Sequence, residues 1–450
     1  MSGRAGSVPA ASPGAAILAA LLALAAAAGC GGEGPPPPVA VSDSAGVRVV
    51  RSHRPAWTEG EAWRVAGRPE AVLSGLPGSF RPEAVRRLSD GRLAALDPDG
   101  RRLAIRPELV DIPAAEGVPA GPATLAALLP GDTVAVGEAR GAAVHLFGPD
   151  GGRGRTLRLE GPGPGRFTPR ILGSLADGTL VAVPRFDRVV FPGGKVLRDT
   201  LPLLAFGRDG ALEDTLGALA SAERFFARVQ SEAGPLQGRV RRPYAREELA
   251  AVADTVLVTA DNGGLTWEAR DRGGALRLRS AAPFRTRRVG AEDIAAYREE
   301  ALRRAPDEFR ALRRKLLREV PFPGRKPVLA DLLVDATGHV WAGLAEGPWR
   351  PPTEWRVFAP DGRWLGTVST PSGLEVQQVG ADFVAGIRRG GDDAPAAVVH
   401  RLVKPAGPGA PGGAAGRGEA PTDAGAGGRG DTAGPDDPAD RMDPPGPRDG

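Results

Sequence analysis

The sequence has 450 residues, with 58 Lys and Arg against 54 Asp and Glu and a formal net charge of +4. This small excess of positive charge does not favour nucleic acid as a partner. Because the chain has a single cysteine, it cannot form an internal disulfide, so a hydrophobic core must stabilise it.

The first thirty residues have the three parts of an export signal: one basic residue, an apolar run from Ala15 to Ala28, and small residues before Cys30. The apolar run has fourteen residues, fewer than the roughly 18 that a membrane-spanning helix needs. The segment resembles a bacterial lipoprotein signal. This resemblance implies that residues 1–29 are removed, that Cys30 carries the lipid, and that Gly31 directs the protein to the outer membrane of a two-membrane cell. A cleaved secretory signal with a chance cysteine is the alternative.

Two low-complexity segments flank the middle of the chain. Residues 30–46 contain four consecutive prolines, which favour an extended spacer, so we expect a lipidated tether there. Residues 405–450 consist largely of Gly, Pro, Ala and Asp, with almost no large apolar side chain. Such a composition cannot bury enough apolar surface to offset its ordering entropy, so we expect a disordered tail.

Residues 47–404 contain a repeat in which a turn with Asp or Gly leads into an apolar, alternating strand. The six copies, aligned on their first strand residue, begin at 93, 134, 180, 256, 340 and 384. Three spacings, of 41, 46 and 44 residues, match the roughly 40–50 residues of a four-stranded propeller blade. The other two, of 76 and 84 residues, indicate a blade with an insertion. The predicted fold class is therefore all-β, a six-bladed β-propeller.

A second turn follows an aromatic strand in several copies, as at Asp361-Gly362, and Asp-Gly suits hairpin turns because their central positions often need a positive φ. The last copy offers only three strands, so we expect Val47–Val50 to supply the fourth and close the ring. Together with the Gly-Pro-Gly-Arg-Phe connector at 163–167, this pattern resembles the six-bladed β-propeller lipoproteins of bacteria, which are related to NHL-repeat propellers. The resemblance implies the architecture and leaves the activity open.

The two insertions differ in kind. Residues 220–248 predict a loop with a short helix, and residues 291–319 predict a helical hairpin. Apolar residues follow one face of each of its helices: Ile294, Tyr297 and Ala301 in the first, Phe309, Leu312 and Leu316 in the second. Arg310, Arg314 and Arg318 recur every four residues and share a different face. That face is either a patch for anionic headgroups or polymers or a solvated helix surface laced with ion pairs.

The chain shows no familiar catalytic or metal-binding motif. The histidines are scattered, and we expect His145 and His339, which lie in apolar strands, to be hydrogen-bonded core residues rather than ligands. The only asparagine, Asn262, argues against the calcium sites of propeller lactonases, which draw on more than one Asn. Trp349 lies in a proline-flanked loop and either packs in the core or stacks on a sugar or peptide. No catalytic residue, metal site or cofactor is predicted.

The predicted function is that of a lipid-anchored, extracytoplasmic propeller that binds a ligand or protein without catalysis. Its candidate binding residues are Arg310, Arg314, Arg318 and Trp349. The expected partners are the membrane, through the lipid on Cys30, and an envelope protein or anionic polymer, with the protein itself a monomer in the cell envelope. The alternative is an extracytoplasmic hydrolase or lyase whose site is assembled at the central channel from several blades.

Overall fold

The computed structural model describes residues 37–405, except 106–107, 114–121, 164–166, 186–193, 232–233 and 391–393. The expected lipid site at Cys30 and the expected disordered tail from 406 onward lie outside the described residues, as does most of the connector at 163–167. All elements below belong to the compact unit that begins at Val39. Among the described helices, none combines the length and the hydrophobicity needed to span a bilayer.

The strands of the repeat form six sheets in the described part of the chain, and in the first five the four core strands pair in chain order. The first sheet consists of β5–β8 (Ala84–Arg87, Leu93–Asp97, Arg102–Ile105, Glu108–Asp111). The second consists of β9–β12 (Ala123–Leu129, Thr133–Glu138, Ala143–Phe147, Arg153–Arg158). The third consists of β13, β14, β16 and β17 (Pro169–Ser174, Leu180–Pro184, Thr200–Phe206, Leu212–Ala220). The next two are β20–β23 (Glu248–Ala253, Val256–Asp261, Thr266–Arg270, Leu276–Ala281) and β24–β27 (Leu329–Val334, Val340–Leu344, Glu354–Phe358, Trp364–Ser369). The sixth joins β28–β30 (Leu374–Val379, Phe383–Arg388, Ala396–Val403) to β3 (Arg64–Val65).

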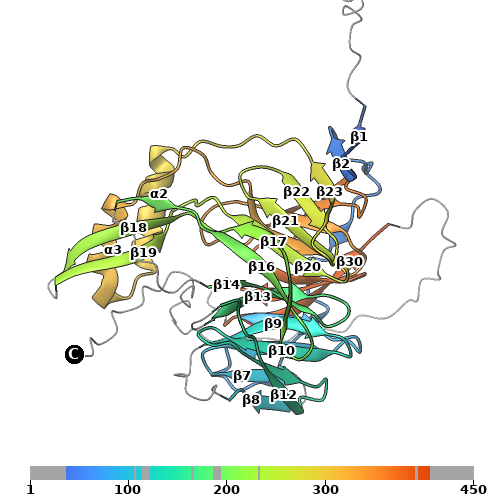
Figure 1. Cartoon of the computed structure of the whole chain (residues 1–450), viewed down its shortest axis with the longest axis horizontal. Coiled ribbons are helices and arrows are strands. Elements are labelled where there is room, and N and C mark those ends of the chain that lie inside the picture. The colour runs from blue at the N-terminus through green and yellow to red at the C-terminus, as the bar shows by residue number, and fades with distance from the viewer. Residues whose placement is uncertain are drawn as a thin grey trace, which may run out of the picture. The chain divides into compact units, whose positions relative to one another are not determined.

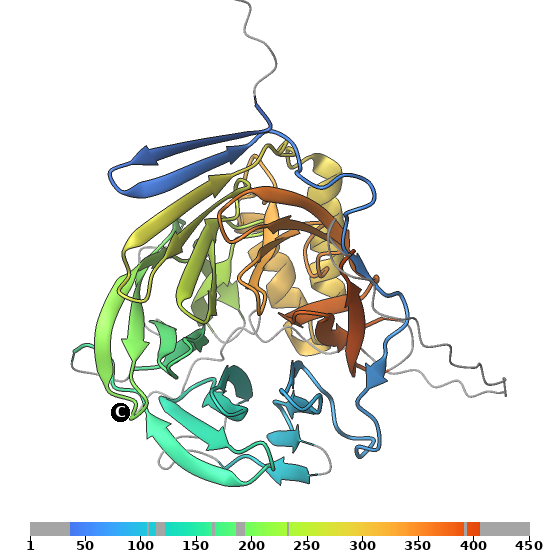
Figure 2. The ribbon, with the colours of Figure 1, turned by 90° about the vertical axis from the view of Figure 1, so that its right-hand side faces the viewer.

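The first strands of the six sheets lie next to one another and form the inner edge of a ring. β5, β9, β13, β20, β24 and β28 contact one another in this order, and β28 in turn contacts β5. Figure 2 shows the sheets arranged around a common centre. Apolar side chains pack into a shared cluster at each junction of neighbouring sheets, including the junction of the sixth with the first. The unit is a β-propeller, so the predicted all-β propeller fold class is confirmed.

In the Asp-Gly turns of the repeat, the Asp side chain accepts a backbone hydrogen bond and the Gly adopts a positive φ. At Asp361-Gly362, Oδ1 of Asp361 accepts a hydrogen bond at 3.1 Å from the N–H two residues further on, and Gly362 has a φ of +93°. Asp177 and Gly178 repeat this arrangement, with a distance of 3.0 Å and a φ of +88°. Residues with a Cβ atom rarely adopt such a φ, so these two positions favour glycine.

The strand that completes the sixth sheet is not the predicted one. Val47–Val50 lies in β2 (Val47–Ser52), which pairs in parallel with β23 and, with β1 (Val39–Ser44), extends the fourth sheet. β30 pairs instead with β3 and with β4 (Ala71–Val72). Val50 is fully buried in the core shared by the fourth and fifth sheets, which explains the apolar pattern that suggested a closing strand. An N-terminal segment does close the ring, but a later one than expected.

The described insertions leave the ring on one face. β15 (Val196–Leu197) follows a second strand, while β18 (Arg224–Ser231) and β19 (Gly234–Arg241) precede the inner strand β20. The helices α2 (Ala291–Arg303) and α3 (Asp307–Glu319) precede the inner strand β24. Because strands of a sheet alternate in direction, the end of each second strand lies beside the start of each inner strand. We call this side of the ring the entry face.

The predicted helical hairpin at 291–319 is present as α2 and α3, and Figure 1 shows it beside β18 and β19. Leu316 and Val320 of this region pack with Phe225 and Val240 of the strand pair. Residues 220–248 were expected to form a loop with a short helix, and this prediction is wrong. The contact with α3 buries apolar residues of the segment and thereby stabilises the two strands.

The expected apolar face of α3 is present except at Phe309, because Leu316 is buried and Leu312 packs against the same cluster. Arg313, Leu316 and Leu317 are its buried residues, whereas Phe309 is 43% exposed. Phe309 lies in the first turn of the helix, before the stretch that packs on the strand pair. In α2 the expected face is present, since Tyr297 and Ala301 are buried.

Candidate active site at the inner strands

Charged residues lie near the start of consecutive inner strands, on the entry face. Arg170 is the second residue of β13, Asp331 the third of β24 and Glu375 the second of β28. Glu247 immediately precedes β20. Their electrostatic interactions cross from sheet to sheet, from Arg170 to Glu247 and from Asp331 to both glutamates. These four residues are the inner charge cluster.

Asp331 has the properties of an acid–base group. A β-bulge between Leu329 and Asp331 interrupts the pairing of β24 with β25, and such bulges re-aim side chains. The residue is half-buried, and its Oδ1 accepts a hydrogen bond from the Leu332 N–H at 2.8 Å. Desolvation by the surrounding protein raises the pKa of Asp331 to about 7, and the charges of Glu375 and Glu247 act in the same direction. At neutral pH this carboxyl can therefore both accept and donate a proton.

The two neighbouring carboxylates have basic partners. Oε2 of Glu375 accepts a hydrogen bond from Nε of Arg389 at 2.9 Å, and Glu247 forms an ion pair with Arg241. The charges of the two carboxylates nevertheless raise the pKa of Asp331, after the larger effect of desolvation. Because like charges at short range disfavour ionisation, they add to the effect of burial on that residue.

Arginines bring positive charge to the same inner edge. Arg170 keeps exposed surface, yet the protein around its guanidinium removes enough water to lower its pKa, and the nearby charge of Arg185 adds to this effect. Burial lowers the pKa of Arg86, on β5, to about 10. A pKa of this size leaves Arg86 protonated at neutral pH. Poorly solvated guanidinium groups of this kind are suited to bind a carboxylate or to stabilise a developing oxyanion.

The only asparagine of the chain fixes the surroundings of the cluster. Oδ1 of Asn262 accepts from the Glu247 N–H at 3.1 Å, and its Nδ2 donates to the Ala245 carbonyl at 3.0 Å. Its own carbonyl accepts from the Val328 N–H at 2.6 Å, just before β24. Asn262 is 2% exposed, so it ties the start of β20 to the start of β24.

The residues predicted from sequence lie elsewhere. Arg310 pairs with Asp307 at 2.6 Å, while Arg314 and Arg318 line a groove between α2 and α3. The ring of Trp349 is half-buried and stacks on Tyr297, with centroids 4.6 Å apart, and the guanidinium of Arg304 lies 5.4 Å from its centroid. None of these residues belongs to the inner charge cluster.

The two histidines that were expected in strands have protein partners, although only His145 lies in a strand and His339 comes just before β25. Nδ1 of His145 lies 3.0 Å from the Thr156 hydroxyl, and burial lowers the pKa of His145. Nδ1 of His339 lies 2.9 Å from the Thr337 hydroxyl and 3.3 Å from Asp335. Among the described residues, no group of three or more His, Cys, Asp or Glu side chains is arranged to hold a metal ion.

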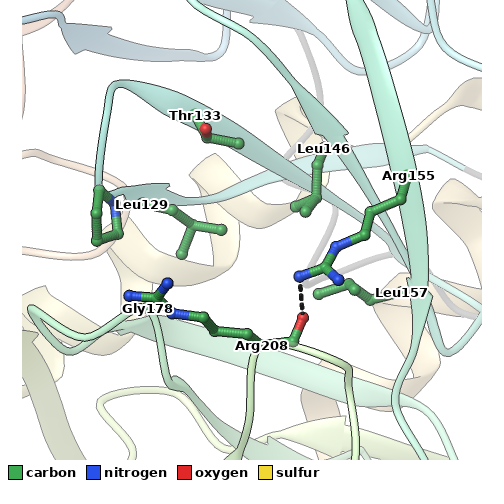
Figure 3. A pocket seen from close by; sticks show the side chains of 8 residues that line it. Leu129, Thr133, Leu146, Arg155, Leu157, Gly178 and Arg208 are labelled. Carbon is green, nitrogen blue, oxygen red and sulfur yellow. Dashed lines mark hydrogen bonds between the residues drawn. The ribbon is translucent and has the colours of Figure 1, made fainter.

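A second hollow lies on the opposite side of the ring, between the second and third sheets. It has a volume of about 260 Å³ and an apolar lining from Leu129, Leu146 and Leu157. In Figure 3 the side chains of Arg155 and Arg208 reach into this hollow, and Arg155 donates to the Arg208 carbonyl at 2.6 Å. The described residues that line it include no carboxylate, histidine or cysteine, so it offers less for acid–base catalysis than the inner charge cluster.

Sequence reasoning missed the inner charge cluster, although the sequence holds a signal for it. Glu247, Asp331 and Glu375 each stand nine residues before the aligned repeat positions 256, 340 and 384. A carboxylate at the same repeat position in three consecutive copies is what a site shared between blades requires.

The chain matches no protein-family model. No curated protein sequence matches it either. Among solved structures it is similar to a member of the DUF4221 family from Bacteroides vulgatus, with a TM-score of 0.41, 11% identity, and coverage of 77% of this chain and 99% of that one. A gluconolactonase from Xanthomonas campestris has a TM-score of 0.35, 16% identity and coverage of 72% and 86%. Virginiamycin B lyase from Staphylococcus aureus has a TM-score of 0.35, 9% identity and coverage of 76% and 99%. At these identities the likeness concerns the fold alone.

The comparisons correct two expectations. The similar structures are mostly those of enzymes, among them lactonases, lyases and a luciferin-regenerating enzyme. They contradict the prediction of a binding module without catalysis and the expectation that the chain is not an enzyme. The sequence contains no contiguous catalytic motif because the inner charge cluster draws its residues from separate sheets.

Proposed function

We propose that this chain is a six-bladed propeller hydrolase or lyase whose site lies where the inner strands converge on the entry face. The observation that carries the proposal is Asp331, a half-buried carboxyl with a pKa of about 7 beside charged residues of neighbouring sheets. Strongly shifted pKa values at a convergence of elements are typical of catalytic groups.

Asp331 is the general base in this proposal. In a hydrolysis it takes a proton from water as the water attacks a carbonyl or acetal carbon. In an elimination it takes a proton from the carbon next to a carboxylate, the electron pair forms a double bond to the adjoining carbon, and the bond from that carbon to the leaving oxygen breaks, with the oxygen protonated by water. Arg170 binds the anionic part of the substrate. Desolvation, with a smaller contribution from the charges of Glu375 and Glu247, keeps the pKa of Asp331 close to the working pH. An anionic substrate suits both reactions.

The proposal places this activity outside the cytoplasmic membrane. Its support is the sequence pattern before Cys30, and the lipid on that residue is the proposed membrane anchor. A substrate in the envelope, such as an acidic polymer or an ester, would reach an anchored enzyme directly.

The test uses the mature chain with Cys30→Ser and two panels of substrates. Lactones and aryl esters report hydrolysis, and uronate-containing oligosaccharides report elimination through the absorbance of the new double bond. For a substrate that is turned over, Asp331→Asn should lower kcat by about 100-fold or more, and the activity of the unsubstituted enzyme should rise with pH around pH 7. Asp99→Asn, at an exposed carboxylate between β6 and β7, is the matched control and should leave kcat unchanged.

A substrate-free measurement makes the proposal refutable. Carboxyl carbon chemical shifts, followed from pH 3 to 9, give the pKa of Asp331 directly when spectra of the parent chain and Asp331→Asn are compared. A titration near pH 7 supports the assigned role. A titration near the ordinary value of about 4 removes the general base and with it the proposed site.

A further inference from the structure

The two inserted helices form a groove of about 250 Å³ between them. Leu302 and Leu317 supply its apolar lining, and Leu317 is 4% exposed. Arg298, Arg314 and Arg318 surround these leucines, and all three arginines are exposed. Figure 1 shows α2 and α3 lying together at one side of the sheets. We call these five residues the helix groove.

The three groove arginines form no ion pair with any described residue, although carboxylates are present on the same helices. Glu300 is occupied by Arg303 and Arg304, at 2.5 and 2.6 Å, and Asp307 is occupied by Arg310 at 2.6 Å. The groove therefore keeps an excess of positive charge. This distribution differs from the sequence expectation, because Arg310 is neutralised and Arg298, from the other helix, takes its place.

We propose that the helix groove binds a phosphate group that carries an alkyl chain. Guanidinium groups donate paired hydrogen bonds that match phosphate oxygens, and three of them can surround a dianion. The two leucines give the adjoining methylene groups an apolar surface to cover. A purely inorganic anion would leave those leucines uncovered. A neutral chain would leave the three positive charges uncompensated, although the guanidinium of Arg298 also lies over the ring of Phe322, 5.6 Å from its centroid.

This site is independent of the proposed reaction. Its residues lie on α2 and α3, whereas the inner charge cluster lies on or next to the inner strands. The chemistry of the ligand has two possible sources, the headgroup of an anionic lipid in a bilayer and a free alkyl phosphate. The experiment separates them.

Binding is measured by calorimetry on the full mature chain, with octyl phosphate as the probe and inorganic phosphate and octyl glucoside as comparisons. The triple variant Arg298→Gln, Arg314→Gln, Arg318→Gln should bind octyl phosphate about 100-fold more weakly, because each lost charge-assisted hydrogen bond is a large part of such an affinity. The corresponding triple Lys variant, which keeps the charge and loses the paired geometry, should lie in between. The matched control is the triple variant Arg92→Gln, Arg277→Gln, Arg363→Gln. It also removes three positive charges, but from arginines that are paired with aspartates and lie outside the helix groove.

Several results would overturn the proposal. Equal binding by the groove variant and the control variant would show that only net charge matters. If inorganic phosphate bound as tightly as octyl phosphate, the leucines would have no role in binding. If octyl glucoside bound as tightly as octyl phosphate, the arginines would have none. Sedimentation with vesicles then identifies the source. Arginine-dependent binding to phosphatidylglycerol vesicles, but not to phosphatidylcholine vesicles, indicates a lipid headgroup, and binding of octyl phosphate alone indicates a free amphiphile. Melting curves of all variants confirm that they are folded.

Discussion

Replacing Asp331 by Asn should make the stability of this protein less dependent on pH. The carboxyl of an unfolded aspartate has a pKa of about 3.9. In the folded protein the pKa of Asp331 is about 7, because desolvation disfavours its charged form. Between these values the folded state binds a proton that the unfolded state has lost. The free energy of unfolding therefore falls as pH rises from 4 to 7 and levels off above that.

The size of the effect follows from the same two values. They lie about 3 pH units apart, and each unit corresponds to about 1.36 kcal/mol, so ionising Asp331 costs the folded state at most about 4 kcal/mol. Asn has nearly the same shape, its Oδ1 can still accept from the Leu332 N–H, and it carries no charge. The variant should match the parent at pH 4 and exceed it by up to about 4 kcal/mol at pH 8.

Urea denaturation at pH 4, 5, 6, 7 and 8 measures this difference. Other titrating groups affect both proteins equally, so the gap between the two curves isolates Asp331. The reasoning is refuted if the two curves stay parallel across this range. A stabilising change at a proposed catalytic residue would also show that the fold tolerates this carboxyl at a cost, which is common at active sites.

Three further predictions follow from other parts of the molecule. Asp335→Asn should lower the free energy of unfolding by about 2 kcal/mol at pH 7, because the pKa of Asp335 in the folded protein is about 2. This loss of stability should become smaller as the pH falls from 4 towards 2, and urea denaturation of both proteins measures it. Deleting residues 64–72 should lower the melting temperature more than deleting β1, since only the former opens the ring; equal shifts would contradict the assigned closure. Cys30→Ser should release the protein from membranes, and variant protein that still sediments after a carbonate wash would argue against lipid anchoring.

The sheets could be predicted from the sequence because their turns are local. An Asp that accepts an N–H two residues further on, followed by a glycine with positive φ, is encoded within four residues, as at Asp361-Gly362. The closing strand could not be predicted in the same way. Val47–Val50 has the stronger apolar pattern, but β3 and β4 are two-residue strands whose pairing with β30 depends on the assembled ring.

The insertions show the same division between local and tertiary information. The helices at 291–319 have their own periodicity and were predictable. The strands β18 and β19 depend on burial against α3, which lies far away in sequence, and no pattern within 220–248 indicates that contact. Phe309 was misplaced because its spacing fits the apolar face while the helix meets its neighbours only further along.

The candidate site depends on a contrast that no sequence pattern expresses. Asp331 and Asp335 are four residues apart, yet the pKa of the first is raised to about 7 and that of the second is lowered to about 2. Burial alone would raise the pKa of Asp335 as well, but its carboxylate interacts with the side chain of His339, whose Nδ1 lies 3.3 Å from Oδ1. It also accepts hydrogen bonds from the His339 N–H at 2.9 Å and from the Thr337 hydroxyl at 2.8 Å, and together these lower the pKa. Within the described part of the chain, Asp331 accepts a hydrogen bond only from the N–H of Leu332. The fold thus stabilises the charge of Asp335 and leaves Asp331 able to exchange a proton at neutral pH. Asp335 follows the last residue of β24, at the opposite end of the strand from Asp331, so it takes no part in the inner charge cluster.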